Sequence, residues 1–360
     1  MADIKVIADR ADIVAIANAI RAKTSSTRDM TIAEMPTQIG DISGGNTDIE
    51  DSLITRTLSG VYENSRVTSI GSSVFYNFPS LTSINFPLCT NIGNGAFGTC
   101  LSLTSINFPL CTSIGSNAFS NCRSLTSANF PSCTKIGSSA FAYCFSLKSA
   151  NFPLCTSIGF GAFNSCSSLT SINFPLCTSI GSSAFYSCRS LTSGSFPSCT
   201  SIGFSAFHTC SSLTSVSFPL CTAIGSSAFF YCTSLTSVSF PVCTTIGGNA
   251  FWGCSSLTSI SFPLCTNIGS YAFYNCSSLT SVSFPVCTTI GGNAFSNCTN
   301  LITLYLTGSS LCTLVNSNAF GLAGITSSTG SIFVNASLVN SYKTATNWTY
   351  FSNVIYAYEE

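Results

Sequence analysis

Residues 103–122 read LTSINFPLCTSIGSNAFSNC, and this stretch returns along the chain with a fixed period of 22 residues. Its tetrapeptide Phe-Pro-x-Cys begins at Phe86, Phe108, Phe130, Phe152, Phe174, Phe196, Phe218, Phe240, Phe262 and Phe284. A fixed period of this length is typical of solenoids, in which each repeat forms one coil and buries its apolar side against its neighbours. Such a fold has a long surface and no deep central pocket, so the repeat favours recognition over catalysis.

The sequence of one repeat predicts the structure of one coil. Residues 105–108 alternate polar and apolar, as a half-buried strand does, and Pro109 ends the strand because proline cannot donate to the ladder. Residues 114–115 mark a turn, and residues 118–119 predict a short helical or 3₁₀ turn. The predicted core positions are Leu103, Ile106, Phe108, Cys111, Ile114, Ala118, Phe119 and Cys122. Stacked copies therefore predict a β-rich solenoid with a parallel sheet on one face and turns on the other.

The charged residues are distributed unevenly. Of 24 charged residues 17 lie at positions 1–66, and no Asp or Glu occurs between Glu63 and Glu359. This excludes paired catalytic carboxylates and oxygen-rich calcium sites from the repeats, and it leaves His208 without an acidic triad partner there. The other cations are too scattered to bind nucleic acid: Arg123, Lys135, Lys148, Arg189 and Lys343. The sequence predicts a protein that is not an enzyme and uses no cofactor.

Two further features bear on location. No run of about 18 apolar residues occurs, so we expect no insertion into a membrane. Residues 1–6 are not followed by an apolar segment and a small-residue cleavage site, so we expect no secretory signal peptide.

Twenty of the 21 cysteines follow the repeat. The first ladder is Cys89, Cys111, Cys133, Cys155, Cys177, Cys199, Cys221, Cys243, Cys265 and Cys287. The second is Cys100, Cys122, Cys144, Cys166, Cys188, Cys210, Cys232, Cys254, Cys276 and Cys298. No CxxC pair occurs, and the first repeat has Phe78 where later repeats have the second cysteine, which a metal ligand would not tolerate. The pattern favours buried, reduced thiols that act as small apolar core residues and bind no metal.

The repeat Leu-Thr-Ser-Ile-x-Phe-Pro…Ile-Gly-x-x-Ala-Phe-x-x-Cys resembles the BspA-like class of leucine-rich repeats over residues 67–305. That resemblance implies an arc-shaped solenoid used in adhesion and surface recognition. The repeats here are one residue shorter than the usual form. The closing region, 306–360, resembles the C-terminal cap of such arrays, in which a strand and a short helix cover the last coil, so Trp348 is expected in the core of the cap.

The N-terminal region differs from the repeats. Residues 12–24 and 30–36 predict a small α-helical segment within residues 1–42, followed by a linker and N-terminal cap at 43–66. These residues resemble the N-terminal segment of phage tail-associated proteins. The resemblance implies docking to other tail or baseplate subunits, or self-association into a homo-oligomer. An alternative is a helical cap that shields the first coil.

Candidate contact residues come from positions that vary between repeats while the core stays constant. These positions follow Ile-Gly, Ala-Phe and the second Cys, and they are predicted to lie on the turn side. The chosen residues are Tyr143, Phe145, Tyr186, His208, Phe230, Tyr231, Trp252, Tyr271 and Tyr274. Aromatic rings among small polar residues resemble an antibody paratope. The alternative is that some rings fold over neighbouring coils and close the core, above all Phe160 and Phe204.

The sheet face suggests another hypothesis. Threonine recurs there at every coil but one, and asparagine recurs directly before each Phe-Pro up to Asn173. Regular hydroxyl rows about 4.8 Å apart are a pattern that an ice-binding plane would use.

Taken together, these features lead us to expect a non-enzymatic recognition protein of a phage tail that contacts a bacterial cell-surface glycan or protein and is carried in the virion. The alternatives are a structural spacer or fibre subunit, and ice binding through the Thr ladder.

Overall fold

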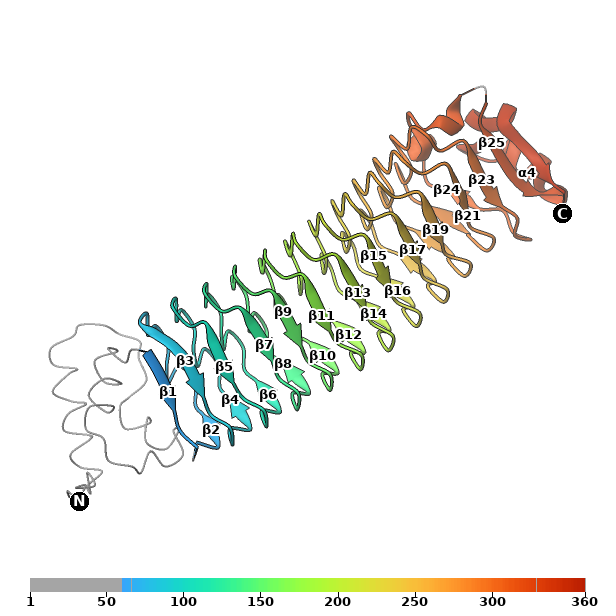
Figure 1. Cartoon of the computed structure of the whole chain (residues 1–360). Helices are drawn as coiled ribbons and strands as arrows, with labels where there is room; N and C mark the ends of the chain where they lie inside the picture. Colours follow the sequence, from blue (N-terminus) through green and yellow to red (C-terminus); the bar gives the residue numbers. More distant parts are fainter. Residues whose placement is uncertain (1–59, 66, 328, 360) are drawn as a thin grey trace, which may run out of the picture.

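The computed structural model describes residues 60–65, 67–327 and 329–359, and the predicted helical segment at 1–42 lies outside them. Within these residues the chain winds as a stack of coils from β1 (Gly60–Glu63) to β26 (Ile355–Tyr358), and every strand pairing is parallel. Figure 1 shows a long and nearly straight array with its two described ends far apart. The predicted β-solenoid is confirmed, whereas the arc implied by the family resemblance is not visible.

One side of the solenoid is a continuous sheet of 12 two-residue strands within the described part of the chain. The strands, in order, are β2 (Ser69–Ile70), β4 (Asn91–Ile92), β6 (Ser113–Ile114), β8 (Lys135–Ile136), β10 (Ser157–Ile158), β12 (Ser179–Ile180), β14 (Ser201–Ile202), β16 (Ala223–Ile224), β18 (Thr245–Ile246), β20 (Asn267–Ile268), β22 (Thr289–Ile290) and β24 (Thr313–Leu314). The last of these strands lies beyond residue 305, so coil stacking continues into the region assigned to the C-terminal cap.

The second side is a row of longer strands that breaks into shorter sheets. Its strands after β1 are β3 (Leu81–Asn85) and β5 (Ser105–Asn107), then β7 (Ser127–Asn129), β9 (Ser149–Asn151) and β11 (Ser171–Asn173), then β13 (Ser193–Ser195), β15 (Ser215–Ser217), β17 (Ser237–Ser239) and β19 (Ser259–Ser261), then β21 (Ser281–Ser283), β23 (Thr303–Leu306), β25 (Ser331–Asn335) and β26. The middle residue of these strands varies between Ile, Ala, Gly and Val, and Ile106 is only partly buried.

The third side of each coil consists of turns. The short turn expected at residues 118–119 is present, with a 3₁₀-type bond from the Ala118 N–H to the Gly115 carbonyl at 3.3 Å, but it does not extend into a helix: 3₁₀ helices occur only from residue 317 onward in the described chain. These turns form a backbone ladder of their own, because the Phe119 N–H donates to the Ala140 carbonyl of the next coil at 2.7 Å. The N–H groups alternate along the turn, one bonding to the next coil and the following one within its own coil, so no continuous helical ladder forms.

Residues 317–359 close the far end. They contain η1 (Ser317–Phe320), η2 (Gly324–Thr326), η3 (Ala336–Leu338), α4 (Val339–Thr344) and η4 (Trp348–Val354). Trp348 is buried, and its indole N–H donates to the Cys312 carbonyl at 2.7 Å, which ties the cap to the last coil. No helix among the described residues has the length and hydropathy of a membrane span.

The core has the predicted composition. Two rows of phenylalanines run along the axis: in one, Phe141 stacks on Phe163 at 5.3 Å between centroids, and in the other Phe152 stacks on Phe174 at 5.3 Å. The rows meet edge to face, as at Phe152 and Phe163, whose centroids lie 5.9 Å apart. Stacked and edge-to-face pairs add to the free energy of burial. The coils are thereby held in one register over the whole array.

A row of glycines allows the coils to approach. In each Ile-Gly pair the glycine packs on the glycine of the preceding coil: a Cβ on Gly159 would lie 2.7 Å from the carbonyl carbon of Gly137. The same close approach recurs at Gly93, Gly115, Gly137, Gly181, Gly203, Gly225, Gly247, Gly269 and Gly291. The backbone φ at these positions is not left-handed, so the requirement for glycine is steric.

Candidate functional site

The turn side requires unusual backbone angles at two positions in each coil. In the coil of residues 103–122 these are Asn117 (φ 56°) and Asn121 (φ 63°). Positive φ is tolerated by Gly, and among other residues mostly by Asn, Asp and His. Most coils accordingly place Asn, Ser, Thr or Gly at both positions. The Asn and Gly residues at these two positions are therefore explained by backbone geometry, whereas Ser and Thr, for example Thr209 (φ 59°), are not favoured by it.

Three of the predicted contact residues depart from that rule. Tyr143 (φ 62°), Tyr231 (φ 54°) and Tyr271 (φ 59°) hold a bulky side chain in the left-handed region. Such a conformation costs about 1–2 kcal/mol for a residue with a Cβ. The next coil leaves room for the Tyr231 ring because it has Gly253 at that point. A Cβ on Gly253 would lie 2.9 Å from the ring. Backbone geometry does not explain these tyrosines.

Five more predicted residues form one continuous stack, which we name the aromatic row. It consists of the residue that follows Ala-Phe in five consecutive coils: Tyr186, His208, Phe230, Trp252 and Tyr274. Successive centroids are 4.6, 4.6, 5.6 and 4.3 Å apart, with interplanar angles of 16°, 13°, 32° and 33°. The structure thus brings these five predicted residues together, one per coil.

Two of the strained tyrosines flank the aromatic row. Tyr231 meets Phe230 edge to face at 4.8 Å, and Tyr271 stacks on Trp252 at 5.2 Å. The hydroxyl of Tyr274 accepts a hydrogen bond from the Asn297 side chain at 2.8 Å, which fixes the end of the row. Seven of the nine predicted residues therefore form one cluster over the coils of residues 182–275.

The stacking decides which part of each ring a partner can reach. The inner rings of the aromatic row cover each other's faces, and all five are half-buried. Their edges and polar atoms remain accessible, whereas a sugar needs an uncovered ring face to stack on. The row is therefore a rigid ridge suited to edge contacts and hydrogen bonds.

The remaining two predicted residues form a separate group. Tyr143 and Phe145 lie 6.3 Å apart, and the Arg123 guanidinium lies 5.7 Å from the Phe145 centroid. The Arg123 Nε–H also donates to the Asn121 side chain at 2.8 Å. A cation held over a ring in this way is attracted to its face. The structure therefore gives this group a fixed positive charge that the aromatic row lacks.

Phe160 and Phe204 were the rings most expected to close the core. That expectation is wrong: 58% of Phe160 and 57% of Phe204 are exposed, and neither ring contacts another ring among the described residues. They occupy the first position after Ile-Gly, where the neighbouring coils place Ser138, Ser182 and Ser226. The core is already complete beneath them, so they project outward.

His208 lies between two aromatic rings. Burial lowers the pKa of its imidazole below the usual 6.5, and its Nδ1 lies 2.6 Å from the Thr209 hydroxyl. Desolvation disfavours the charged form of the ring. The histidine is therefore neutral in the folded protein at pH 7.

We expect the folded protein to lose stability on acidification through this residue. The folded-state pKa lies below the unfolded value, so the unfolded chain takes up the proton first, and stability falls as the pH drops from above 6.5 to the folded pKa. This part of the pH dependence is expected to vanish in His208→Phe, which keeps a ring in the row. Thermal unfolding between pH 5 and 8 checks it, and the NMR signal of the single histidine gives the pKa directly. An imidazole pKa at or above 6.5 would contradict the prediction.

The cysteines are buried, as the sequence predicted, and none forms a disulfide. The Cys111 thiol donates to the Ser113 carbonyl at 3.2 Å, and the Cys122 thiol donates to the Phe97 carbonyl at 3.1 Å. Burial raises the pKa of the Cys89 thiol to about 11 and that of Cys100 to about 12. The thiolate is the form that attacks electrophiles and binds metals, so these thiols are inert at neutral pH. In the described chain no group of three or more His, Cys, Asp or Glu side chains is placed to hold a metal ion.

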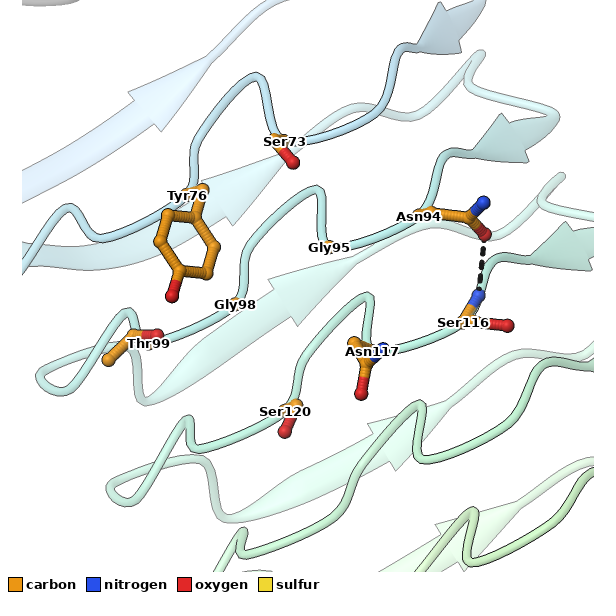
Figure 2. A pocket seen from close by; sticks show the side chains of 9 residues that line it. All are labelled: Ser73, Tyr76, Asn94, Gly95, Gly98, Thr99, Ser116, Asn117 and Ser120. Carbon is orange, nitrogen blue, oxygen red and sulfur yellow. Dashed lines mark hydrogen bonds between the residues drawn. The ribbon is translucent and has the colours of Figure 1, made fainter. Parts of the chain in front are cut away.

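The turn side also contains a hollow that the sequence analysis missed. It has a volume of about 410 Å³ and lies over the first coils of the array. Figure 2 shows Tyr76 at one side of it and the hydrogen bond between the Ser116 N–H and the Asn94 side chain, 2.8 Å long, at the other. Gly98 and Ser120 occupy the positions where later coils carry the aromatic row. In the sequence, these two small residues were the signal that a hollow lies there.

The polar rows of the sheet face are largely bonded within the solenoid. The hydroxyls that donate to a carbonyl of the preceding coil are those of Thr104, Thr126, Thr170, Thr214, Thr236 and Thr258. The Asn107 amide donates to the Asn85 side chain at 2.7 Å, and Asn151 and Asn173 continue this ladder. These rows therefore hold the coils together and have fewer free donors than a plain hydroxyl surface.

Comparisons with known proteins agree with this architecture. The model for the BspA type leucine rich repeat region (6 copies) matches residues 49–156, 134–242 and 222–343. A leucine-rich repeat protein from Bacteroides ovatus is 25% identical over 83% of this chain and 92% of its own, with a TM-score of 0.51. A leucine rich cell surface protein from Faecalibacterium prausnitzii is 27% identical over 80% of this chain and 86% of its own, with a TM-score of 0.46. A comparison with curated proteins gives no match. With the family model covering most of its length, the chain belongs to the BspA-type leucine-rich repeat family.

Proposed function

We propose that this protein is a non-enzymatic recognition protein that contacts a partner on a bacterial cell surface through the aromatic row and its flanking tyrosines. The observation that carries the proposal is the strain at Tyr143, Tyr231 and Tyr271. Each occupies a position that other coils fill with the smaller residues Asn, Gly, Ser or Thr, and strained residues cluster at functional sites. The cost of a left-handed backbone is kept at three tyrosines on the turn side. This supports a role for their rings in contacting a partner.

The chemistry of the surface supports the same proposal. Tyrosine, tryptophan and histidine edges present C–H, O–H and N–H groups beside Ser, Thr and Asn, a combination common in binding surfaces. The rings are fixed by stacking, so little side-chain entropy is lost on binding. The partner is a glycan or a protein that meets the ridge along several coils, which makes the contact multivalent.

The test compares Tyr231→Asn with the natural chain. The substitution places a residue that tolerates positive φ, so it relieves part of the backbone strain, and it removes an edge-to-face contact worth about 0.5–1.5 kcal/mol. We therefore expect the free energy of unfolding to stay within about 1 kcal/mol, while binding of the labelled full chain to bacterial cells or their isolated wall glycans falls at least about tenfold, or about 1.4 kcal/mol. Chemical denaturation and a cell-binding assay give the two readouts.

Tyr350→Asn is the matched control, since Tyr350 is 76% exposed and lies in η4, away from the row. It should change neither readout. Unchanged cell binding by Tyr231→Asn combined with Trp252→Ser would overturn the proposal. Absence of cell binding together with an oligomer that buries these rings would instead support the structural spacer, which sedimentation of the full chain detects.

The finer version of the proposal is a receptor-binding protein of a phage tail, carried in the virion and joined to tail or baseplate subunits through residues 1–42. It rests on the sequence resemblance of that segment alone, which lies outside the described residues and outside the family match, since that match begins at residue 49. Its test is co-purification of the full chain with tail particles. Ice binding has less support, because the Thr hydroxyls of the sheet face already donate to neighbouring coils.

A further inference from the structure

We propose that the hollow beside Tyr76 binds a neutral saccharide. This inference rests on the proposed function, which is recognition at a bacterial surface, and deepens it by naming one class of ligand. The hollow lies over the first coils (Figure 2), whereas the aromatic row begins at Tyr186. The two surfaces share no residue, so each can be tested without the other.

The first argument concerns the ring. Tyr76 is 42% exposed and has no ring partner among the described residues. In the aromatic row, Tyr186 is covered by His208 of the next coil, at 4.6 Å. The residue one coil after Tyr76 is Gly98, and the Tyr76 ring packs on it, since a Cβ there would lie 2.9 Å from the ring Cδ2. No protein ring covers the exposed part of Tyr76, which therefore remains open to a ligand, unlike the inner rings of the row.

The second argument concerns the polar lining. Asn94, Thr99, Ser116 and Ser120 contribute amide and hydroxyl groups to the hollow. Within the described chain the side chains of Thr99, Ser116 and Ser120 form no hydrogen bond, and Asn94 uses only its oxygen, to accept from the Ser116 N–H. Hydroxyls donate and accept, and the free amide N–H groups donate. This set matches the alternating donors and acceptors of a sugar's hydroxyl groups.

The third argument concerns charge and size. None of the residues that line the hollow is charged. A charged ligand placed there would lose hydration without gaining a counter-charge, so the site favours a neutral one. Its volume of about 410 Å³ falls within the usual range of about 300–1,000 Å³ for small-molecule sites. An apolar ring beside small polar groups then selects a molecule with one apolar face and a hydroxyl rim, as a pyranose has.

The array itself provides the variant that closes the site. Ser120 occupies the position that Tyr186 and Tyr274 occupy in later coils, so Ser120→Tyr introduces a ring that this backbone position accepts elsewhere. Its ring would occupy the side of the hollow that Ser120 now lines, beside Gly98. The matched control is Asn164→Tyr, which introduces the same ring at the same coil position outside the hollow.

The experiment titrates the full chain with glucose, galactose, N-acetylglucosamine and their β-linked dimers, with glucuronic acid as the charged comparison, by calorimetry and ligand-observed NMR. We expect at least one neutral sugar to bind and glucuronic acid to bind at least about tenfold more weakly. Ser120→Tyr and Tyr76→Ala should abolish binding, whereas Tyr76→Phe and Asn164→Tyr should retain it. Binding of none of these sugars, or equal binding by Ser120→Tyr, would overturn the inference.

Loss of cell binding in the aromatic-row variants with sugar binding intact would leave this inference standing. Loss of sugar binding alone would leave the proposed function standing.

Discussion

Gly159→Ala is expected to destabilise the array by about 3 kcal/mol. The new methyl group would lie 2.7 Å from the carbonyl carbon of Gly137 and 2.7 Å from the Ser138 nitrogen, both of which are backbone atoms. A side chain could rotate away, but these atoms are held by the ladder of the 12-stranded sheet. The two coils must therefore separate locally and lose part of their shared core. Chemical denaturation measures the loss, and hydrogen exchange should place it at β8 and β10.

The matched control is Gly161→Asn, two residues further on. Gly161 has φ +57°, and the atoms nearest to its Cβ would be the Ser139 hydroxyl oxygen at 3.5 Å and the Asn164 Cβ at 3.7 Å, both ordinary contacts. Asn occupies this position in other coils, for example Asn117 and Asn249. We expect a loss of no more than about 1 kcal/mol, because Asn tolerates positive φ better than most residues with a Cβ. Equal effects of the two substitutions would show that the glycine row is not required for close stacking.

Phe163→Ala is expected to cost about 4 kcal/mol. The ring stacks between Phe141 and Phe185 at 5.3 and 5.4 Å, and it meets Phe152 and Phe174 edge to face at 5.9 and 5.8 Å. Truncation leaves a cavity between two coils whose backbones are bonded together and cannot collapse into it. Because each coil contacts only its neighbours, the loss should weaken the whole array at one interface.

Phe160→Ala is the control for this prediction, with the same chemical change three residues earlier. Phe160 is 58% exposed and contacts no ring in the described chain, so its truncation should change the free energy of unfolding by no more than about 0.5 kcal/mol. Urea titrations of both variants give the comparison. A large loss at Phe160 would mean that this ring packs on its neighbours after all.

The period of the sequence was sufficient to predict the solenoid and its core. The positions of Phe108, Cys111 and Ile114 keep an apolar residue in every repeat, and all three residues are buried. Each packs against the equivalent residue of the adjacent coils. The absence of acidic residues between Glu63 and Glu359 likewise excludes paired carboxylates from the repeats on the sequence alone. The grouping of Tyr186, His208 and Trp252 also followed from the period, since residues 22 apart lie side by side.

Backbone angles and ring orientations came only from the tertiary structure. The sequence does not show that Tyr231 has φ 54°, that the inner row covers its own ring faces, or that Phe160 projects into solvent. It also did not indicate that the N–H groups of these turns alternate, with Ala118 bonding within its own coil and Phe119 bonding to the next.

The physical reason for this division is that burial repeats with the sequence, whereas φ, hydrogen-bond direction and the space beside a ring depend on contacts between coils. The sequence by itself therefore determined the architecture and the residue types that are missing from the repeats. The stacked coils decided which rings are open to a partner.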